Sequence, residues 1–457
     1  MNHTDQLYAL RKYYDSGQTK SYSFRKTQLQ SLKRAIVKYE KEIAHALYTD
    51  LKKSPEESYA SETGLLITEI NLALKNLRTW MRPRIVDTDL VNFPSGSKIY
   101  RDPLGVVLII APWNYPLQLI LNPLVGAIAG GNCAVLKPSE VAASTSVMVE
   151  KIISEIFPAD FVKVVTGDGS EVVPAMMKNF RFDHVFYTGS VEVGRAIYKM
   201  AAEQLVPVTL ELGGKSPAIV EADANLSTAA KRIVLGKFLN AGQTCIAPDY
   251  ILVQDSIRDR FITKLKQAIT DFYTDNAGSS YDYGKIINEK RFDKLVSYLG
   301  SGKIVAGGQY DRSKLFIAPT VLEDVSMDSP LMTEEIFGPV LPLIGYSTTS
   351  EAIEIVQRNP NPLAFYLFST NKNTERQWIE KVSFGGGCVN NADWHFTNHS
   401  MPFGGVGNSG IGAYHGKYSF TTFTREKPVL KTPNWFDPSI KYPPMKGRLK
   451  LFKWLFR

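Results

Sequence analysis

Apolar residues near the N-terminus recur at the three- and four-residue steps of amphipathic helices. The first series consists of Leu29, Leu32, Ile36, Ile43, Leu47 and Leu51, with Tyr39 filling the gap. It predicts one long helix over residues 25–52. A second series, from Leu66 to Met81, predicts another helix that Pro83 ends. Residues 87–101 lack a helical period, and we interpret them as a strand or hairpin that stands off the main body.

A different pattern begins at Gly105. Residues 105–111 are apolar without alternation, as expected of a strand buried on both faces of a parallel sheet. Further strands are predicted at 133–136, 161–165, 184–187, 206–210, 218–221, 251–254, 303–306, 340–345 and 365–369. Helices are predicted between them at 123–129, 144–157, 172–178, 193–203, 226–239, 257–272 and 350–358. This alternation predicts an α/β fold built from βαβ units in doubly wound sheets.

Composition narrows the class of protein. A chain of 457 residues is too long for one ordinary core, so two or three domains are expected. Its content of 44% apolar and 21% charged residues is typical of a globular protein. Cys133, Cys245 and Cys388 are too scattered for a disulfide framework, and histidines are few. We therefore expect a reducing compartment and no metal site.

Charge and hydropathy limit the partners. The N-terminus has no apolar signal core, and the longest apolar runs fall short of the ~18–20 residues that cross a bilayer. The net charge of +8 is modest for this length, so no nucleic-acid partner is expected. These features predict a cytoplasmic protein.

Cys245 is the first candidate for chemistry. It follows an apolar helical run and lies in the turn 240–245, which contains a glycine, and a predicted strand comes next. A sulfur on such a turn is open to a small molecule, and its thiolate is a strong nucleophile. The alternative is an inert, buried cysteine that behaves as a small hydrophobic residue.

Two further turns follow predicted strands, where α/β sheets bind ligands. Gly189, Ser190 and Gly194 lie where a strand turns into a helix, whose free N–H groups suit a phosphate. Glycine at such a turn is also explained by conformation alone. Lys137 and Glu140 can bind ribose hydroxyls. Alternatively, they mark a helix start, with the serine between them as its cap and Glu140 in the first turn.

Three more residues are candidates, and two of them suit acyl chemistry. Asn114 follows the strand at 105–111, and its neutral amide is suited to stabilise an oxyanion. Glu211 ends a predicted strand before two glycines, where a carboxylate can act as a general base toward water. Glu335 lies beside the aromatic Phe337. Taken singly, Glu211 and Glu335 are more commonly explained as solvated glutamates, and Asn114 can be a turn asparagine between two prolines.

The order of these motifs resembles the aldehyde dehydrogenase superfamily. They are APWNYP (111–116), KPSE (137–140), YTGSVEVG (187–194), ELGGKSP (211–217), GQTC (242–245), EEIFGP (334–339) and PFGGVGNSG (402–410). The segment 401–417 and the short N-terminus are similar to the class 3 branch, which includes fatty-aldehyde enzymes. The resemblance implies NAD(P)-dependent oxidation of an aliphatic or aromatic aldehyde to the acid.

The resemblance also implies roles for named residues. Cys245 would attack the aldehyde carbon, Asn114 and the Cys245 N–H would hold the oxyanion, and Glu211 would activate the water that hydrolyses the thioester. The residues implied for NAD, with NADP also accepted, are Trp113, Lys137, Glu140, Gly189, Ser190, Gly194, Glu335 and Phe337. A substrate tunnel is expected to be lined by Tyr115, Leu119, Phe403 and His415.

The resemblance further implies two Rossmann-like domains and a small bridging element that forms a homodimer. We predict a cofactor domain at 1–85 and 99–210, a catalytic domain at 211–395, and a bridging element at 86–98 and 396–430. An acylating relative would pass the thioester to coenzyme A, but Glu211 favours hydrolysis. A non-catalytic scaffold remains the alternative from another class, against which the retention of Cys245, Glu211 and Asn114 argues.

The remaining tail, 431–457, ends in a basic and aromatic segment. Lys446, Lys450, Lys453 and Arg457 would share one face of a terminal helix, and bulky apolar residues occupy the others. This composition suggests peripheral contact with an anionic membrane. The alternative is a tail that docks on its own or a partner subunit.

Overall fold

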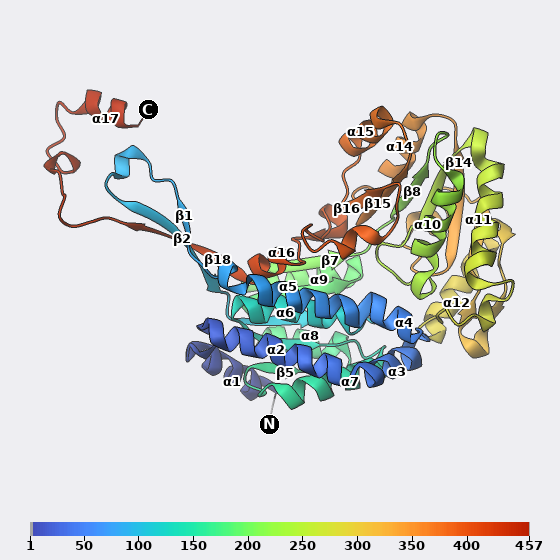
Figure 1. The fold of residues 1–457 in the computed structure, drawn as a ribbon, viewed down its shortest axis with the longest axis horizontal. Coiled ribbons are helices and arrows are strands. Elements are labelled where there is room, and N and C mark those ends of the chain that lie inside the picture. Colours follow the sequence, from blue (N-terminus) through green and yellow to red (C-terminus); the bar gives the residue numbers. More distant parts are fainter. Residues whose placement is uncertain (1–2, 457) are drawn as a thin grey trace.

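The computed structural model describes residues 3–456 and contains two large sheets, with an arm projecting beside the first (Figure 1). In the first sheet the strand order is β17-β7-β6-β3-β4-β5. Its parallel strands are β3 (Val106–Ile110), β4 (Cys133–Lys137), β5 (Val162–Val164), β6 (His184–Gly189) and β7 (Val208–Leu212). The short strand β17 (Gly410–Ile411) pairs antiparallel with β7. Every residue of β3 and β4 is buried, as their unbroken apolar runs predict.

Helices cover this sheet. The helices that alternate with its strands along the sequence are α6 (Gln118–Gly130), α7 (Ala143–Ile156), α8 (Gly169–Asn179) and α9 (Val191–Glu203). The N-terminal helices that pack around them are α1 (His3–Asp15), α2 (Tyr22–Lys38), α3 (Glu40–Leu51), α4 (Pro55–Ser58) and α5 (Gly64–Trp80). A five-residue π-helical turn, η2 (Tyr59–Thr63), joins α4 to α5.

The second sheet has the order β10-β13-β14-β9-β8-β15-β16, parallel except for β10. Its strands are β8 (Pro217–Val220), β9 (Tyr250–Gln254), β10 (Lys303–Ala306), β13 (Thr320–Glu323), β14 (Val340–Tyr346), β15 (Ala364–Phe368) and β16 (Gly386–Val389). The helices of this region are α10 (Leu226–Phe238), α11 (Arg258–Tyr273), α12 (Glu289–Ser297), α13 (Pro330–Thr333), α14 (Thr349–Gln357) and α15 (Lys372–Lys381). The predicted α/β fold with two doubly wound sheets is therefore confirmed.

The arm consists of β1 (Arg84–Val86), β2 (Gly96–Pro103) and β18 (Thr424–Lys431), in the order β1-β2-β18. Strand β18 pairs along the whole of β2, from Thr424 opposite Pro103 to Lys431 opposite Gly96. The hairpin expected near residues 87–101 is thus present. Beyond it the chain runs to a terminal helix, α17 (Leu449–Leu455), at the far end of the arm (Figure 1). Arg457, expected on the basic face of this helix, lies outside the described residues.

One predicted helix boundary is wrong. Residues 25–52 form two helices, because the backbone turns at Tyr39 (φ −100°, ψ 15°). The apolar period continues across the break, since the Tyr39 ring is buried and its hydroxyl donates to Glu155. Helix α7 (Ala143–Ile156) agrees with the predicted helix 144–157, and Asp50 accepts hydrogen bonds from Ser144 N and Thr145 N at its start. The alternative interpretation, in which Ser139 caps a helix that contains Glu140, does not hold.

The predicted domain bounds remain predictions, but the sheets divide the chain near them. Glu211 lies in β7 of the first sheet, and the strands of the second sheet come from residues 217–389. No helix in the described part of the chain combines the length and apolar character that crossing a bilayer requires. Within residues 3–456, no group of three or more His, Cys, Asp or Glu side chains is placed to hold a metal ion.

Candidate active site

The topology of the first sheet brings several predicted residues to one edge. Strands β3, β4, β6 and β7 are parallel, so their carboxyl ends meet at the same side. Asn114 follows β3, Lys137 ends β4, Gly189 ends β6 and Glu211 lies near the end of β7. Residues that are far apart in the sequence therefore line a common edge.

Cys245 lies on a loop with an unusual backbone. The loop leaves α10 through the short turn η4 (Leu239–Gly242), in which Asn240 and Ala241 both have φ of 51°. Gly242 has φ of 75°, and a Cβ there would meet Gly338 O at 2.4 Å. Gln243 fixes this shape, because its amide donates to Asn240 O and accepts from Ile287 N, both at 3.0 Å. Such strained turns persist only where their surroundings hold them.

Asn114 lies in the loop between β3 and α6 and is 1% exposed. Its backbone carbonyl accepts from Lys53 Nζ at 3.0 Å and from Asn240 Nδ2 at 2.8 Å. The Asn240 contact joins the Asn114 loop to the loop that carries Cys245. By contrast, the side-chain Oδ1 of Asn114 is buried without a hydrogen-bond partner among the described residues.

Glu211 is buried within the site and is not the solvated glutamate of the alternative interpretation. Neither of its carboxylate oxygens has a hydrogen-bond partner of normal geometry in the described chain. Burial raises the pKa of Glu211 to about 7, and the Cys245 thiol and Thr188 hydroxyl offset part of the rise. Burial and the Glu211 charge raise the pKa of Cys245 well above its usual value. A carboxyl that titrates near neutrality beside a thiol is suited to proton transfer.

An apolar cavity opens over the sulfur. All four predicted tunnel residues line it together with Cys245: Tyr115, Leu119, Phe403 and His415. The residues of its wall that sequence reasoning missed are Ser61, Gln118, Leu239, Thr244, Ile246, Asp393, Phe396 and Tyr414. The hydroxyls of Tyr115 and Thr244 form a hydrogen bond of 2.6 Å in this wall. The lining is mostly aliphatic and aromatic, so the cavity suits an apolar molecule.

Asp393 is the unexpected member of this wall. Its carboxyl is buried, Oδ1 lacks a hydrogen-bond partner in the described chain, and burial raises its pKa to about 7. Its φ of 69° is unusual for a residue other than glycine. Asp393 follows β16, a glycine-containing strand that the apolar pattern did not predict. Its position after a parallel strand was the only available signal.

The residues predicted for the adenosine ribose and pyrophosphate lie where helices begin. Lys137 Nζ donates to the Glu140 carboxylate at 2.7 Å, and Glu140 is 44% exposed while Lys137 is 2% exposed. Ser190 caps the N-terminus of α9, because its hydroxyl accepts from Val193 N at 3.4 Å. An exposed carboxylate beside a buried ammonium, next to a capped helix start, suits a ribose and a phosphate.

The residues predicted for the nicotinamide end form a second group. Glu335 is positioned over Gly213, where a Cβ would meet its Oε2 at 2.1 Å. Burial raises the pKa of Glu335 to about 8, and Asp249 adds to the rise. The Phe337 and Trp113 rings meet edge to face with centroids 5.2 Å apart. A carboxyl and two aromatic rings on neighbouring loops fit the polar and flat parts of a dinucleotide.

Comparison with known proteins identifies the family of the chain. Residues 9–429 match the Aldehyde dehydrogenase family. The chain is 47% identical to 4,4'-diaponeurosporen-aldehyde dehydrogenase of Staphylococcus aureus over 99% of this chain and 98% of the relative. It is 44% identical to aldehyde dehydrogenase family 3 member B1 of Rattus norvegicus, covering 97% of this chain and 95% of the relative.

Comparison with solved structures supports the same family. The substrate-bound state of Staphylococcus aureus AldH matches with a TM-score of 0.98 and 46% identity over 100% of both chains. An NAD-dependent aldehyde dehydrogenase from Sinorhizobium meliloti matches with a TM-score of 0.85 and 30% identity, over 95% of this chain and 87% of that chain. The predicted similarity to class 3 enzymes is thereby confirmed. The chain belongs to the aldehyde dehydrogenase family and oxidises an aldehyde to the carboxylic acid with NAD or NADP as the hydride acceptor.

Proposed function

We propose that Cys245 is the nucleophile of this reaction, Asn114 the oxyanion donor and Glu211 the general base. The observation that carries the proposal is the buried Glu211 carboxyl, without a hydrogen-bond partner among residues 3–456, beside the only cysteine that lines the apolar cavity in that range. A buried carboxylate without a partner is costly, so its retention requires a use for it.

The steps follow from the side chains. The Cys245 thiol gives its proton to Glu211, which releases it to solvent, and the sulfur attacks the aldehyde carbon to give a thiohemiacetal whose oxygen gains negative charge. Asn114 Nδ2 and the Cys245 backbone N–H donate to that oxygen. The residues proposed below would hold NAD(P), which would supply the acceptor for the hydride of this carbon. Glu211 then takes a proton from water, which attacks the resulting thioester and releases the acid and the thiol.

For the cofactor, we propose that Lys137 and Glu140 bind the adenosine ribose. Ser190 and the turn from Gly189 to Gly194 would bind the pyrophosphate at the start of α9. Glu335 would bind the nicotinamide ribose, beside Phe337 and Trp113. The exposed Glu140 carboxylate would accept from a 2′-hydroxyl and repel a 2′-phosphate, which favours NAD over NADP.

For the substrate, we propose an extended apolar aldehyde. The cavity wall consists largely of aliphatic and aromatic side chains, and the Staphylococcus aureus relative is named for 4,4'-diaponeurosporen-aldehyde. A series of straight-chain aldehydes, followed by NADH absorbance, tests this. We expect kcat/KM to rise with each added methylene until the cavity is filled. A preference for the shortest aldehyde would contradict the proposal.

The test of the mechanism is the site of the covalent adduct. Quenching the reaction and weighing the intact chain should show an acyl group on Cys245, and Cys245→Ser should abolish both the adduct and turnover. Product should be the free acid without added coenzyme A, because Glu211 activates water. An adduct on Cys133 or Cys388, which lie in β4 and β16, would overturn the assignment.

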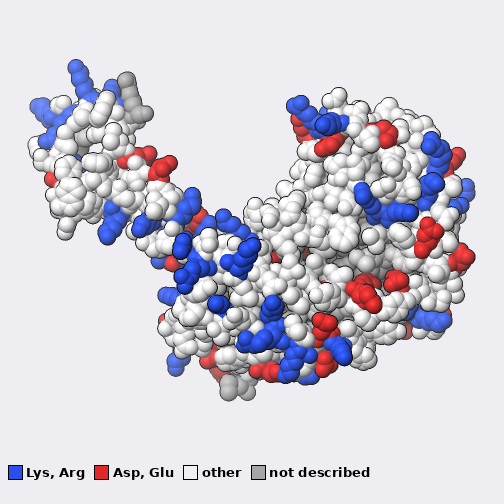
Figure 2. All heavy atoms as spheres, in the orientation of Figure 1, with Lys and Arg blue, Asp and Glu red and all other residues white. Residues whose placement is uncertain are grey.

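We also propose that the arm contacts a second copy of the chain and that the tail touches an anionic membrane. Residues 441–456 contain five lysines and arginines and no acidic residue, and basic residues gather towards the end of the arm in Figure 2. Exposed apolar side chains lie among them, including Leu449, Trp454 and Phe456. Full-length chain should pellet with phosphatidylserine vesicles, and a chain ending at Pro444 should not. Equal pelleting of the two would remove the membrane proposal.

A further inference from the structure

We propose that the buried ion pair of Lys53 and Glu62, together with Glu57, sets the position of Asn114 relative to Cys245. These are positioning residues, which act on the reaction through the two loops they hold. The inference rests on the roles proposed above for Asn114 and Cys245. None of the three belongs to the sequence motifs that resemble the family.

Lys53 and Glu62 form a closed unit inside the protein. Lys53 Nζ lies 2.5 Å from Glu62 Oε1, and both side chains are 0% exposed. They come from the short segment between α3 and α5, which contains α4 and the π-helical turn η2. Such π-helical turns are rare in proteins overall, and those that occur often lie at functional sites.

The ion pair holds the Asn114 loop from two sides. Lys53 Nζ donates to Asn114 O at 3.0 Å, and its ammonium lies 4.0 Å from the centre of the Tyr115 ring. The second oxygen of Glu62 accepts from Leu117 N at 2.9 Å and from Gln118 N at 3.2 Å. The backbone is therefore fixed at Asn114 itself and again where α6 begins.

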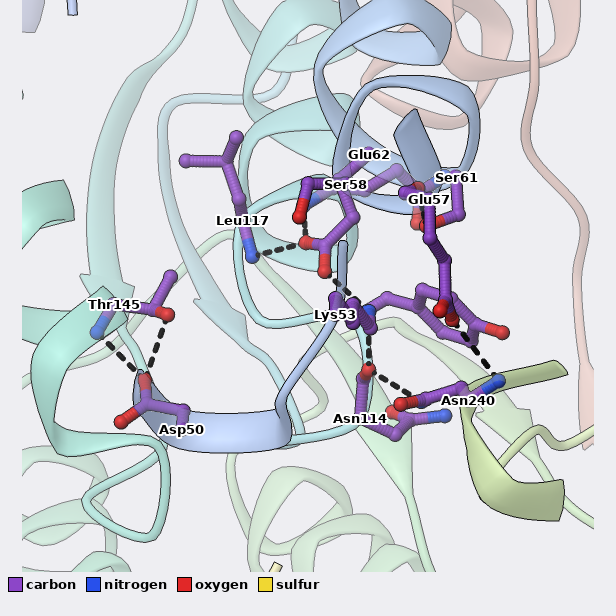
Figure 3. A network of polar contacts seen from close by, with 12 residues as sticks. Asp50, Lys53, Glu57, Ser58, Ser61, Glu62, Asn114, Leu117, Thr145 and Asn240 are labelled. Carbon is purple, nitrogen blue, oxygen red and sulfur yellow. Dashed lines mark hydrogen bonds and ion pairs between the residues drawn. The ribbon is translucent and has the colours of Figure 1, made fainter. Parts of the chain in front are cut away.

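The same segment also holds the loop of the nucleophile. Glu57 Oε1 accepts from Asn240 N at 3.0 Å, and Asn240 Nδ2 donates to Asn114 O at 2.8 Å. Figure 3 shows the Asn114 carbonyl receiving Lys53 and Asn240 together, with Glu57 reaching Asn240 from the other side. One short segment thus ties the oxyanion donor to the strained turn that precedes Cys245.

The ion pair affects catalysis by fixing the geometry of the two loops. A fully buried ion pair adds little net stability, since loss of hydration offsets the attraction. Its partners are, however, held in fixed positions by short, charge-assisted hydrogen bonds. An oxyanion donor acts only when it lies about 3 Å from the charge that develops, and a misplacement of about 1 Å can cost 100-fold in rate.

The test uses two variants and a matched control. Lys53→Met removes the ammonium. The double variant Lys53→Met/Glu62→Gln also removes the carboxylate charge, so that the folded double variant buries no unpaired charge. We expect kcat to fall about 10- to 100-fold in both, as for other supporting contacts, with the KM for NAD within about twofold of wild type. The control is Lys38→Met, which breaks an exposed ion pair of similar length (2.6 Å to Glu155) and should leave kcat unchanged.

A double-mutant cycle separates positioning from general damage. If the pair acts through Asn114, the charge-free double substitution should cost less than about twofold in kcat when added to Asn114→Ala. Full additivity of the two losses, or a folded double variant with wild-type kcat, would overturn the inference. Retention of full activity by Asn114→Ala itself would instead contradict the proposed role of Asn114.

Discussion

The catalytic cavity and the projecting arm depart from an ordinary protein in opposite ways. In and beside the cavity, polar atoms are buried without partners among the described residues, including those of Glu211, Asn114 and Asp393. On the arm, large apolar side chains are exposed, with Ile85 at 76% and Phe93 at 64%. Burying an unpaired polar group costs about 1–3 kcal/mol, and exposing apolar surface costs about 25 cal/mol per Å².

On the roles proposed above, each region is completed by another molecule, and the two molecules differ in chemistry. Polar atoms inside a cavity can be satisfied by a substrate, a cofactor or an attacking water. Exposed apolar side chains at the arm are satisfied by another apolar surface. Changes in the cavity should therefore alter chemistry and pH dependence, and changes in the arm should alter association alone.

The largest effect is expected from Glu211→Gln. Loss of the base should lower kcat by about 10²- to 10⁴-fold. In the wild type, the fraction of ionised Glu211 increases as pH rises through its pKa of about 7, so kcat should rise through the same range and then level. The variant should lack this dependence in a pH profile of steady-state turnover. An unchanged acid limb in the variant would assign that titration to another group.

Asp393→Asn should affect stability at alkaline pH. Burial raises the pKa of Asp393 from 3.8 to about 7. Its contribution to stability is therefore full below about pH 4 and is lost as pH rises through 7. Between pH 5 and pH 8, the free energy of unfolding of the variant should improve relative to wild type by roughly 2 kcal/mol.

Urea unfolding of both proteins at the two pH values measures this difference. Comparing pH values cancels any packing change that is independent of charge. An identical pH dependence in the two proteins would show that Asp393 is paired or hydrated in solution.

A smaller effect is expected from Glu140→Gln. Removing the exposed carboxylate should raise the ratio of kcat/KM for NADP to that for NAD by about five- to tenfold, because a half-exposed like charge contributes about 1 kcal/mol. Glu150→Gln, at an exposed position of α7, is the control. No change in the ratio would remove Glu140 from cofactor selection.

The smallest change in turnover is expected at the arm. The double substitution Ile85→Ser/Leu90→Ser should halve the mass measured by light scattering, with turnover per chain nearly unchanged, because it removes only exposed apolar surface. Leu205→Ser, which changes an 86% exposed residue away from the arm, is the matched control. A wild-type chain that is already 51.0 kDa in solution would contradict the dimer.

Much of this architecture could be predicted from sequence because it is local. Continuous apolar runs predicted β3, β4 and β15, and each motif residue is close in sequence to the strand or turn that positions it. The wrong boundary at Tyr39 and the capping of the start of α7 depend instead on distant contacts, with Glu155 and Asp50 respectively. The hydrophobic period indicates which residues are buried, but it does not indicate where the backbone bends.

Lys53 was missed for the same reason. A lysine between two helices is usually solvated, and only the fold reveals that its ammonium is buried against Glu62 and the Asn114 carbonyl. Asp393 carries no local signal beyond its place after a strand. Groups whose function depends on contacts across the chain require the structure, whereas groups within short motifs do not.

The pairing of β18 with β2 has a consequence for biosynthesis. Strand β2 leaves the ribosome early, yet its partner is made only when translation is nearly complete. Until then β2 presents an open edge, and so does β7, which awaits β17 beside Glu211. A nascent chain can therefore assemble much of its interior before termination, but only the finished polypeptide closes the arm and the β7 edge of the first sheet.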